Sequence, residues 1–116
     1  MSIRRIGAGA RMSKAVVHGN TVYLAGQVAD ASKGASVAEQ TQEIVNIIDA
    51  LLAEAGSDKT KILSATIYLA DISTFPQMNA VWDTWVAQGH TPARATVEAK
   101  LAAPEYTVEI AVIAAI

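Results

Sequence analysis

The C-terminal segment Tyr106–Ala115 constrains the fold most, because the strand that it predicts is apolar on both faces. In the run VEIAVIAAI every residue except Glu109 is apolar, whereas a strand with one face in water alternates between apolar and polar side chains. Such a strand must be covered by helices on one face and by another layer on the other. Since the chain predicts only two helices, we expect a second subunit to form the other layer.

Length and composition indicate one domain with a self-associating surface. The chain has 116 residues, of which 52% are apolar and 17% are charged, and a domain of this size cannot bury so many apolar side chains in a single-subunit core. We expect one domain over residues 1–116 that forms a homo-oligomer. Nine Lys and Arg against eleven Asp and Glu leave a net charge of -2, which argues against a nucleic-acid partner.

Several classes of chemistry lack the residues that they need. Cysteine is absent, which removes disulfides, thiolate nucleophiles and sulfur ligands for metals. The segment Gly7–Met12 begins like a dinucleotide fingerprint but lacks its third glycine and a following helix, so we expect a flexible lead-in and no cofactor. His18 and His90 have no acidic neighbours that would complete a metal site. The N-terminal segment predicts neither a secretory signal nor a membrane span, which favours the cytoplasm.

Apolar periodicity predicts two helices. The first begins at the capping box of Ser36 and Glu39, repeats apolar residues at three- and four-residue steps, and stops at Gly56. The second is predicted from Ser73 or Thr74 to Gly89, with Pro76 in its first turn. Its expected inner stripe consists of Phe75, Met78, Trp82, Trp85 and Val86.

The strands of the predicted sheet lie between and around these helices. A hairpin is expected where two short apolar runs flank Gly19-Asn20, a pair that suits a tight turn. Another strand alternates clearly, with Leu63 on its expected dry face. The predicted strands are Ala15–His18, Thr21–Ala25, Ile62–Leu69, Ala95–Ala99 and Tyr106–Ala115, the last two joined by a turn at residues 102–105. This order predicts an α+β fold, a mixed sheet with two helices on one face and a subunit interface on the other.

Arg94 is the first candidate for a functional role. It follows Thr91-Pro92-Ala93 at the start of a strand, where a rigid neighbour can aim a side chain into a cleft. Its planar guanidinium can bind a carboxylate through two parallel hydrogen bonds. The alternative is an ordinary exposed arginine at a strand end, which is the commoner case for this residue type.

Glu109 and Thr96 are the other candidates that the residues themselves suggest. A lone carboxylate in an apolar strand must be paired, protonated or functional, so Glu109 is either a catalytic group or half of a structural salt bridge, with Arg94 as a possible partner. Thr96 lies two residues after Arg94 and therefore on the same face of that strand. Its hydroxyl could orient a water or a substrate, although threonine is also a common strand former.

Five stretches together resemble the RidA/YjgF/YER057c family from about Arg11 onward. They are HGNTVYLAGQVA, IDALLAEAG, ILSATIYLAD, TPARATVE and EYTVEIAVIAA, in that order and spacing. The resemblance implies a chorismate-mutase-like α+β fold that assembles as a homotrimer with clefts between adjacent subunits. It also implies a hydrolase that deaminates reactive enamines and imines, such as the 2-iminopropanoate formed from 2-aminoacrylate, to 2-keto acids and ammonia.

The resemblance also assigns roles to particular residues. Arg94 corresponds to the arginine that binds the substrate carboxylate, and Glu109 to the glutamate that orients the attacking water. Gly26 and Gln27 correspond to a pair that lines the cleft, and Asn79 to an asparagine of the second helix.

The chain departs from the best-known members at positions that line the expected site. It has Thr96 where they have a cysteine, Met12 where they have a tyrosine, and Ala25 where they commonly have a serine. These departures indicate a subgroup and bear on the breadth of substrates. They leave open a non-catalytic carboxylate-binding trimer and a deaminase dedicated to one aminoacrylate-type pathway intermediate. A nuclease or translation-inhibitor activity, attached to parts of the family, is disfavoured by the acidic balance.

Overall fold

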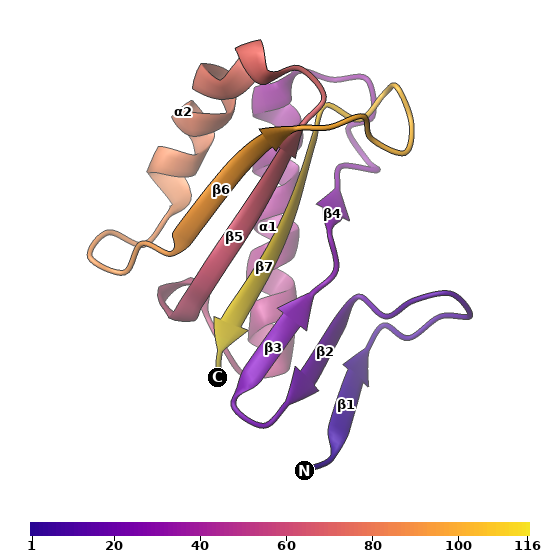
Figure 1. The fold of residues 1–116 in the computed structure, drawn as a ribbon, viewed down its shortest axis with the longest axis vertical. Coiled ribbons are helices and arrows are strands. Elements are labelled where there is room, and N and C mark those ends of the chain that lie inside the picture. The colour runs from indigo at the N-terminus through magenta and orange to yellow at the C-terminus, as the bar shows by residue number, and fades with distance from the viewer.

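The computed structural model describes residues 1–116 and folds them into one mixed sheet with two helices (Figure 1). The strand order is β1-β2-β3-β7-β5-β6, and the short β4 also pairs with β7. Only β5 and β6 run parallel. The strands are β1 Ile3–Ile6, β2 Ala15–His18, β3 Thr21–Leu24, β4 Gln27–Val28, β5 Ile62–Leu69, β6 Ala93–Glu98 and β7 Val108–Ala115.

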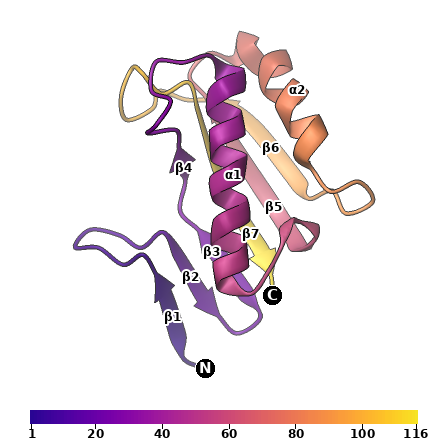
Figure 2. The same cartoon turned by 180° about the vertical axis from the view of Figure 1, so that it is seen from behind.

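Both helices lie on the same face of the sheet, as the sequence predicts (Figure 2). Helix α1, Val37–Ala55, begins at Ser36, whose hydroxyl accepts a hydrogen bond from the Glu39 amide, and ends at Gly56, which has a left-handed backbone with φ of 86°. Helix α2, Phe75–Trp85, packs beside α1 over β5 and β6. None of the helices is long and apolar enough to cross a membrane.

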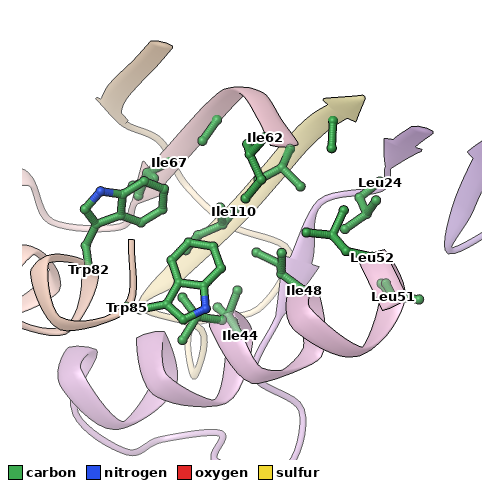
Figure 3. Packing of buried hydrophobic residues seen from close by; sticks show 14 of the residues in the cluster. Leu24, Ile44, Ile48, Leu51, Leu52, Ile62, Ile67, Trp82, Trp85 and Ile110 are labelled. Carbon is green, nitrogen blue, oxygen red and sulfur yellow. The ribbon is translucent and has the colours of Figure 1, made fainter. Parts of the chain in front are cut away.

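The core lies between the helices and the sheet (Figure 3). Side chains of α1, β5 and β7 fill it, together with the indole rings of Trp82 and Trp85, which meet edge to face with centroids 5.2 Å apart. Residues Val108, Ile110, Val112 and Ala114 of β7 point into this core and are buried.

The other face of the sheet is uncovered in a single chain. On β7 this face carries Glu109, Ala111, Ile113 and Ala115, which are only partly buried or exposed. Ile113 is 36% exposed and lies opposite Tyr23, which is 46% exposed. The doubly apolar strand therefore has one covered face and one open apolar face. The expectation that neighbouring subunits of a trimer cover the open face stays a prediction.

A buried glutamine fixes the loop that leads into β7. Gln40 of α1 donates from Nε2 to the carbonyl oxygens of Ala35 and Glu105, at 3.1 and 2.9 Å. Its Oε1 accepts from the Thr107 amide at 2.9 Å. Because these three bonds satisfy the side chain of a fully buried residue, they tie α1 to the start of β7.

The N-terminal segment differs from the sequence prediction. Residues Ile3–Ile6 form the edge strand β1, antiparallel to β2, where no strand was predicted. Gly7, with φ of 61°, turns the chain after this strand. Arg4 also donates to the Ala55 carbonyl oxygen at the end of α1, at 3.3 Å. The open edge of the predicted hairpin therefore recruits a strand whose own sequence has little apolar periodicity.

Two details of the middle of the chain also differ from the prediction. Leu63 was expected on the dry face of its strand, but it is 53% exposed, because the register of β5 against β7 shifts between Ile62 and Ser64. The second helix ends at Trp85 rather than at Gly89, since the backbone of Val86, with ψ of 138°, is no longer helical. Gly89 lies in the following turn, with φ of 81°.

Candidate functional site

The direction of the Arg94 side chain follows from the pairing of β6 with β5. Arg94 pairs with Ala65 and Thr96 with Ile67 in the parallel ladder, and paired residues of neighbouring strands point to the same face. Ala65 and Ile67 are buried beneath the helices. Arg94 and Thr96 therefore share the helix-bearing face, at the edge of the sheet.

Three side chains of helix α2 contact the guanidinium of Arg94. Nη1 of Arg94 donates to Oδ1 of Asn79 at 2.9 Å, its one side-chain hydrogen bond. The guanidinium carbon lies 5.2 Å from the ring centroid of Trp82 and 5.6 Å from that of Phe75, within the range of a cation–π interaction. Arg94 remains exposed and has no carboxylate partner, so most of its donors are free to bind an anion.

Glu109 and Gly26 form a second cluster on the open face of the sheet. A β-carbon placed on Gly26 would lie 2.2 Å from Oε2 of Glu109 and 2.9 Å from its carboxyl carbon. The carboxylate therefore lies directly over the glycine backbone, and a larger residue at this position would displace it. This contact explains why a glycine separates β3 from β4 along the edge of β7.

One chain does not bring Arg94 and Glu109 together. Arg94 pairs with Ala65, and Ala65 with Val112 of β7, three residues from Glu109. Strand spacing and rise put the two α-carbons about 10 Å apart across the sheet and about 10 Å apart along it, and their side chains point to opposite faces. A salt bridge between them within one chain is therefore excluded.

Met12 and Gln27 line a hollow of about 550 Å³ between the N-terminal loop, β4 and α1. Gly26 also borders this hollow, so three residues of the expected site meet there. Nε2 of Gln27 donates back to the Ala25 carbonyl oxygen at 2.8 Å, and Met12 is 57% exposed. Neither Arg94 nor Glu109 reaches this hollow.

Thr96 has a buried hydroxyl oxygen without a hydrogen-bond partner. It lies on the same face as Arg94, as the sequence predicts, and its hydrogen-bonding capacity is unused within one chain. The sequence prediction placed Phe75 and Trp82 on the inner stripe of the second helix and missed their contact with Arg94. The spacing of Phe75, Asn79 and Trp82, at four and three residues on one helix face, is the signal that could have revealed it.

A raised pKa in the loop before β7 belongs to a structural contact. The Tyr106 hydroxyl donates to the Asp30 carboxylate, and this bond, together with desolvation, raises the pKa of Tyr106 above its usual 10.0. The Lys33 ammonium lies 5.2 Å from the centroid of the same ring. These contacts join the loops before α1 and before β7. No group of three or more His, Cys, Asp and Glu side chains is arranged to hold a metal.

Comparison with known proteins agrees with this architecture. A family model described as Endoribonuclease L-PSP matches residues 2–116. The chain belongs to this family. A RutC family protein of Haemophilus influenzae is 48% identical over 114 residues, 98% of each chain. The crystal structure of a YjgF family protein of Neisseria meningitidis superposes with a TM-score of 0.95 and 49% identity, over 99% of this chain and 95% of that one.

The RidA/YjgF membership that the motifs indicate is thereby confirmed, and with it the mixed sheet with two helices on one face. The match begins at residue 2 rather than near Arg11, in keeping with the ordered strand β1. A further relative, 34% identical over 88% of this chain and 77% of its own, is the rat 2-iminobutanoate/2-iminopropanoate deaminase.

Proposed function

We propose that this RidA/YjgF family protein is a hydrolase that deaminates small 2-imino acids, such as 2-iminopropanoate, to 2-keto acids and ammonia. The observation that carries the proposal is the state of Arg94, an exposed guanidinium held by α2 with no acidic partner. Such a group is suited to bind the carboxylate of a small substrate through two parallel hydrogen bonds. The named activity of the rat relative supports the same substrate class.

The proposed site lies between subunits of a homotrimer. One subunit contributes Arg94, Asn79 and Thr96, and its neighbour contributes Glu109 and Gly26. Two features support this arrangement: the two groups of residues lie on opposite faces of one chain, and the face that bears Glu109 is apolar and uncovered. In this assembly Gln27 and Met12 of the neighbour would border the cleft from the side of the Gly26 backbone.

The reaction needs positioning and acid–base help rather than a covalent nucleophile. The enamine first tautomerises to an imine, whose carbon is electrophilic once the nitrogen is protonated. Arg94 holds the carboxylate, while Glu109 accepts a proton from the water that attacks this carbon. Glu109 then gives this proton to the nitrogen of the tetrahedral amino alcohol, and the C–N bond breaks with its electron pair leaving on ammonia. The hydroxyl group gives its proton back to Glu109 as the carbonyl of the keto acid forms, and this proton leaves with the ammonia as ammonium. The Thr96 hydroxyl, which has no hydrogen-bond partner within one chain, would orient the water or the substrate once the cleft is assembled.

The direct test is to generate 2-iminopropanoate in solution and to follow the appearance of pyruvate with and without the protein. The proposal requires a clear acceleration over buffer, and it requires that Arg94→Ala removes most of that acceleration. An Arg94→Ala variant as fast as the parent would contradict it. Protection of the fold by a keto acid without any effect on imine lifetime would indicate a carboxylate-binding trimer without turnover.

Turnover rates measured for several different 2-imino acids would identify the physiological substrate. The proposed general role is to remove reactive imines in the cytoplasm, and a series of 2-imino acids of increasing side-chain size would then be turned over at comparable rates. A strong preference for one aminoacrylate derivative would instead indicate an enzyme dedicated to one pathway. The Thr96 and Met12 positions, where the chain departs from the best-known members, are the first to exchange in that comparison.

A further inference from the structure

Arg94 is held by contacts that leave most of its hydrogen-bond donors unused. Two aromatic faces, those of Trp82 and Phe75, lie 5.2 and 5.6 Å from the guanidinium carbon. The single hydrogen bond goes to a neutral acceptor, Oδ1 of Asn79. A structural arginine is usually held by a carboxylate, which occupies two donors and neutralises the charge. No carboxylate neutralises the positive charge of Arg94 here.

The three contacts come from one rigid element. Phe75, Asn79 and Trp82 follow one another by four and three residues on a single face of α2. Trp82 is 5% exposed, and its ring is fixed by the core and by the neighbouring Trp85. A rigid side chain beneath the guanidinium limits the directions in which the flexible arginine can point.

We propose that Trp82 and Phe75 are positioning residues for Arg94, and that with Asn79 they form an aromatic cradle that sets the preference of the site for carboxylates. The cradle consists of Phe75, Asn79 and Trp82. This inference rests on the proposed role of Arg94 as the carboxylate holder. It adds that the aromatic faces orient the guanidinium plane while leaving its charge and its outer donors to the ligand.

The test compares two buried tryptophans of the same helix. Trp85 is 6% exposed and lies one turn after Trp82. It is no neighbour of Arg94: its ring faces Lys59, and its Nε1 donates to Asp49 at 3.0 Å. Trp85→Leu therefore removes a similar amount of core and one hydrogen bond, and it reaches Arg94 only indirectly, through the edge contact of its ring with Trp82. It is a matched control for Trp82→Leu.

The measurement is the affinity for pyruvate relative to pyruvamide, its neutral counterpart, together with thermal unfolding of each variant. Loss of one aromatic face should weaken pyruvate binding about three- to tenfold and leave pyruvamide binding nearly unchanged. Trp82→Leu and Phe75→Leu should show this effect, Trp82→Phe a smaller one, and Trp85→Leu at most a slight one, since it removes only an edge contact of the Trp82 ring. In turnover assays the first two should raise KM more than they lower kcat.

Each outcome decides the inference. Equal losses in Trp82→Leu and Trp85→Leu, or losses shared equally by pyruvate and pyruvamide, would overturn it. If Trp82→Leu fails to fold, Phe75→Leu decides, because Phe75 is only partly buried. A parent protein with no preference for pyruvate over pyruvamide would also overturn it. A parent that prefers pyruvate but does not accelerate imine hydrolysis would refute the proposed function and leave the cradle intact.

Discussion

Mixing two inactive variants should restore activity, because the proposed site takes its two main groups from different chains. Arg94→Ala removes the proposed carboxylate holder, and Glu109→Gln removes the proposed base while keeping the shape of the side chain. Arg94 and Glu109 point to opposite faces of the same sheet, so neither variant alone can form a complete cleft. In a mixed trimer an intact Arg94 from one variant can face an intact Glu109 from the other.

The size of the recovery follows from counting subunits. When equal amounts of the two variants are co-refolded and assort at random, half of the subunits that supply Arg94 are intact, and so are half of those that supply Glu109. About one quarter of the clefts are then complete, and the mixture should reach about one quarter of the parent activity per mass of protein. If one chain supplied both groups, the mixture would stay inactive.

A second mixture supplies the control. The double variant Arg94→Ala/Glu109→Gln is co-refolded with the parent in equal amounts and assayed with in situ generated 2-iminopropanoate. A site shared between chains again leaves about one quarter of the parent activity, whereas a site within one chain leaves about one half. No recovery in the first mixture, with one half in the second, would refute the assignment of Arg94 and Glu109 to different subunits. Size-exclusion chromatography confirms that both mixtures assemble.

Two further substitutions test features that hold the site. Gly26→Ala places a β-carbon 2.2 Å from the present position of Glu109 Oε2 and so displaces the carboxylate. It should lower kcat at least tenfold while the oligomer persists. An unchanged kcat would show that the position of Glu109 does not matter. Gln40→Ala removes three hydrogen bonds of a buried side chain and should lower the free energy of unfolding in urea by about 2–4 kcal/mol. The exposed Gln42→Ala should change it by less than about 0.5 kcal/mol, and equal losses in both would contradict the role of Gln40.

Features encoded within one element could be predicted from the sequence. The bounds of α1 follow from Ser36 and Gly56, since a capping side chain and a left-handed glycine act on the nearest turn alone. The hairpin of β2 and β3 follows from its two-residue turn for the same reason. The sequence also predicts that Arg94 and Thr96 share a face, because side chains alternate between the two faces along a single strand.

Features that depend on pairing between distant strands could not be predicted from the sequence. Strand β1 forms because β2 has a free edge with which it can pair. The residues Ile3–Ile6 have no pattern of their own that predicts a strand. Leu63 is displaced by a change of register against β7. Whether Arg94 and Glu109 share a face depends on how β6 and β7 are each paired with β5. A shift of either pairing by one residue would turn that side chain to the other face of the sheet. The sequence therefore names the candidate residues one by one, whereas their division between two faces follows only from the pairing of the strands.

The placement of Arg94 and Glu109 on opposite sides of one sheet has a consequence for regulation by abundance. Under the proposed mechanism a newly made chain carries every functional side chain yet has no working site until it meets its neighbours. Specific activity should then fall on dilution as trimers dissociate, even while each chain keeps its helices and strands. The quantity that a cell controls would be the concentration of assembled clefts, which rises more steeply than the amount of polypeptide.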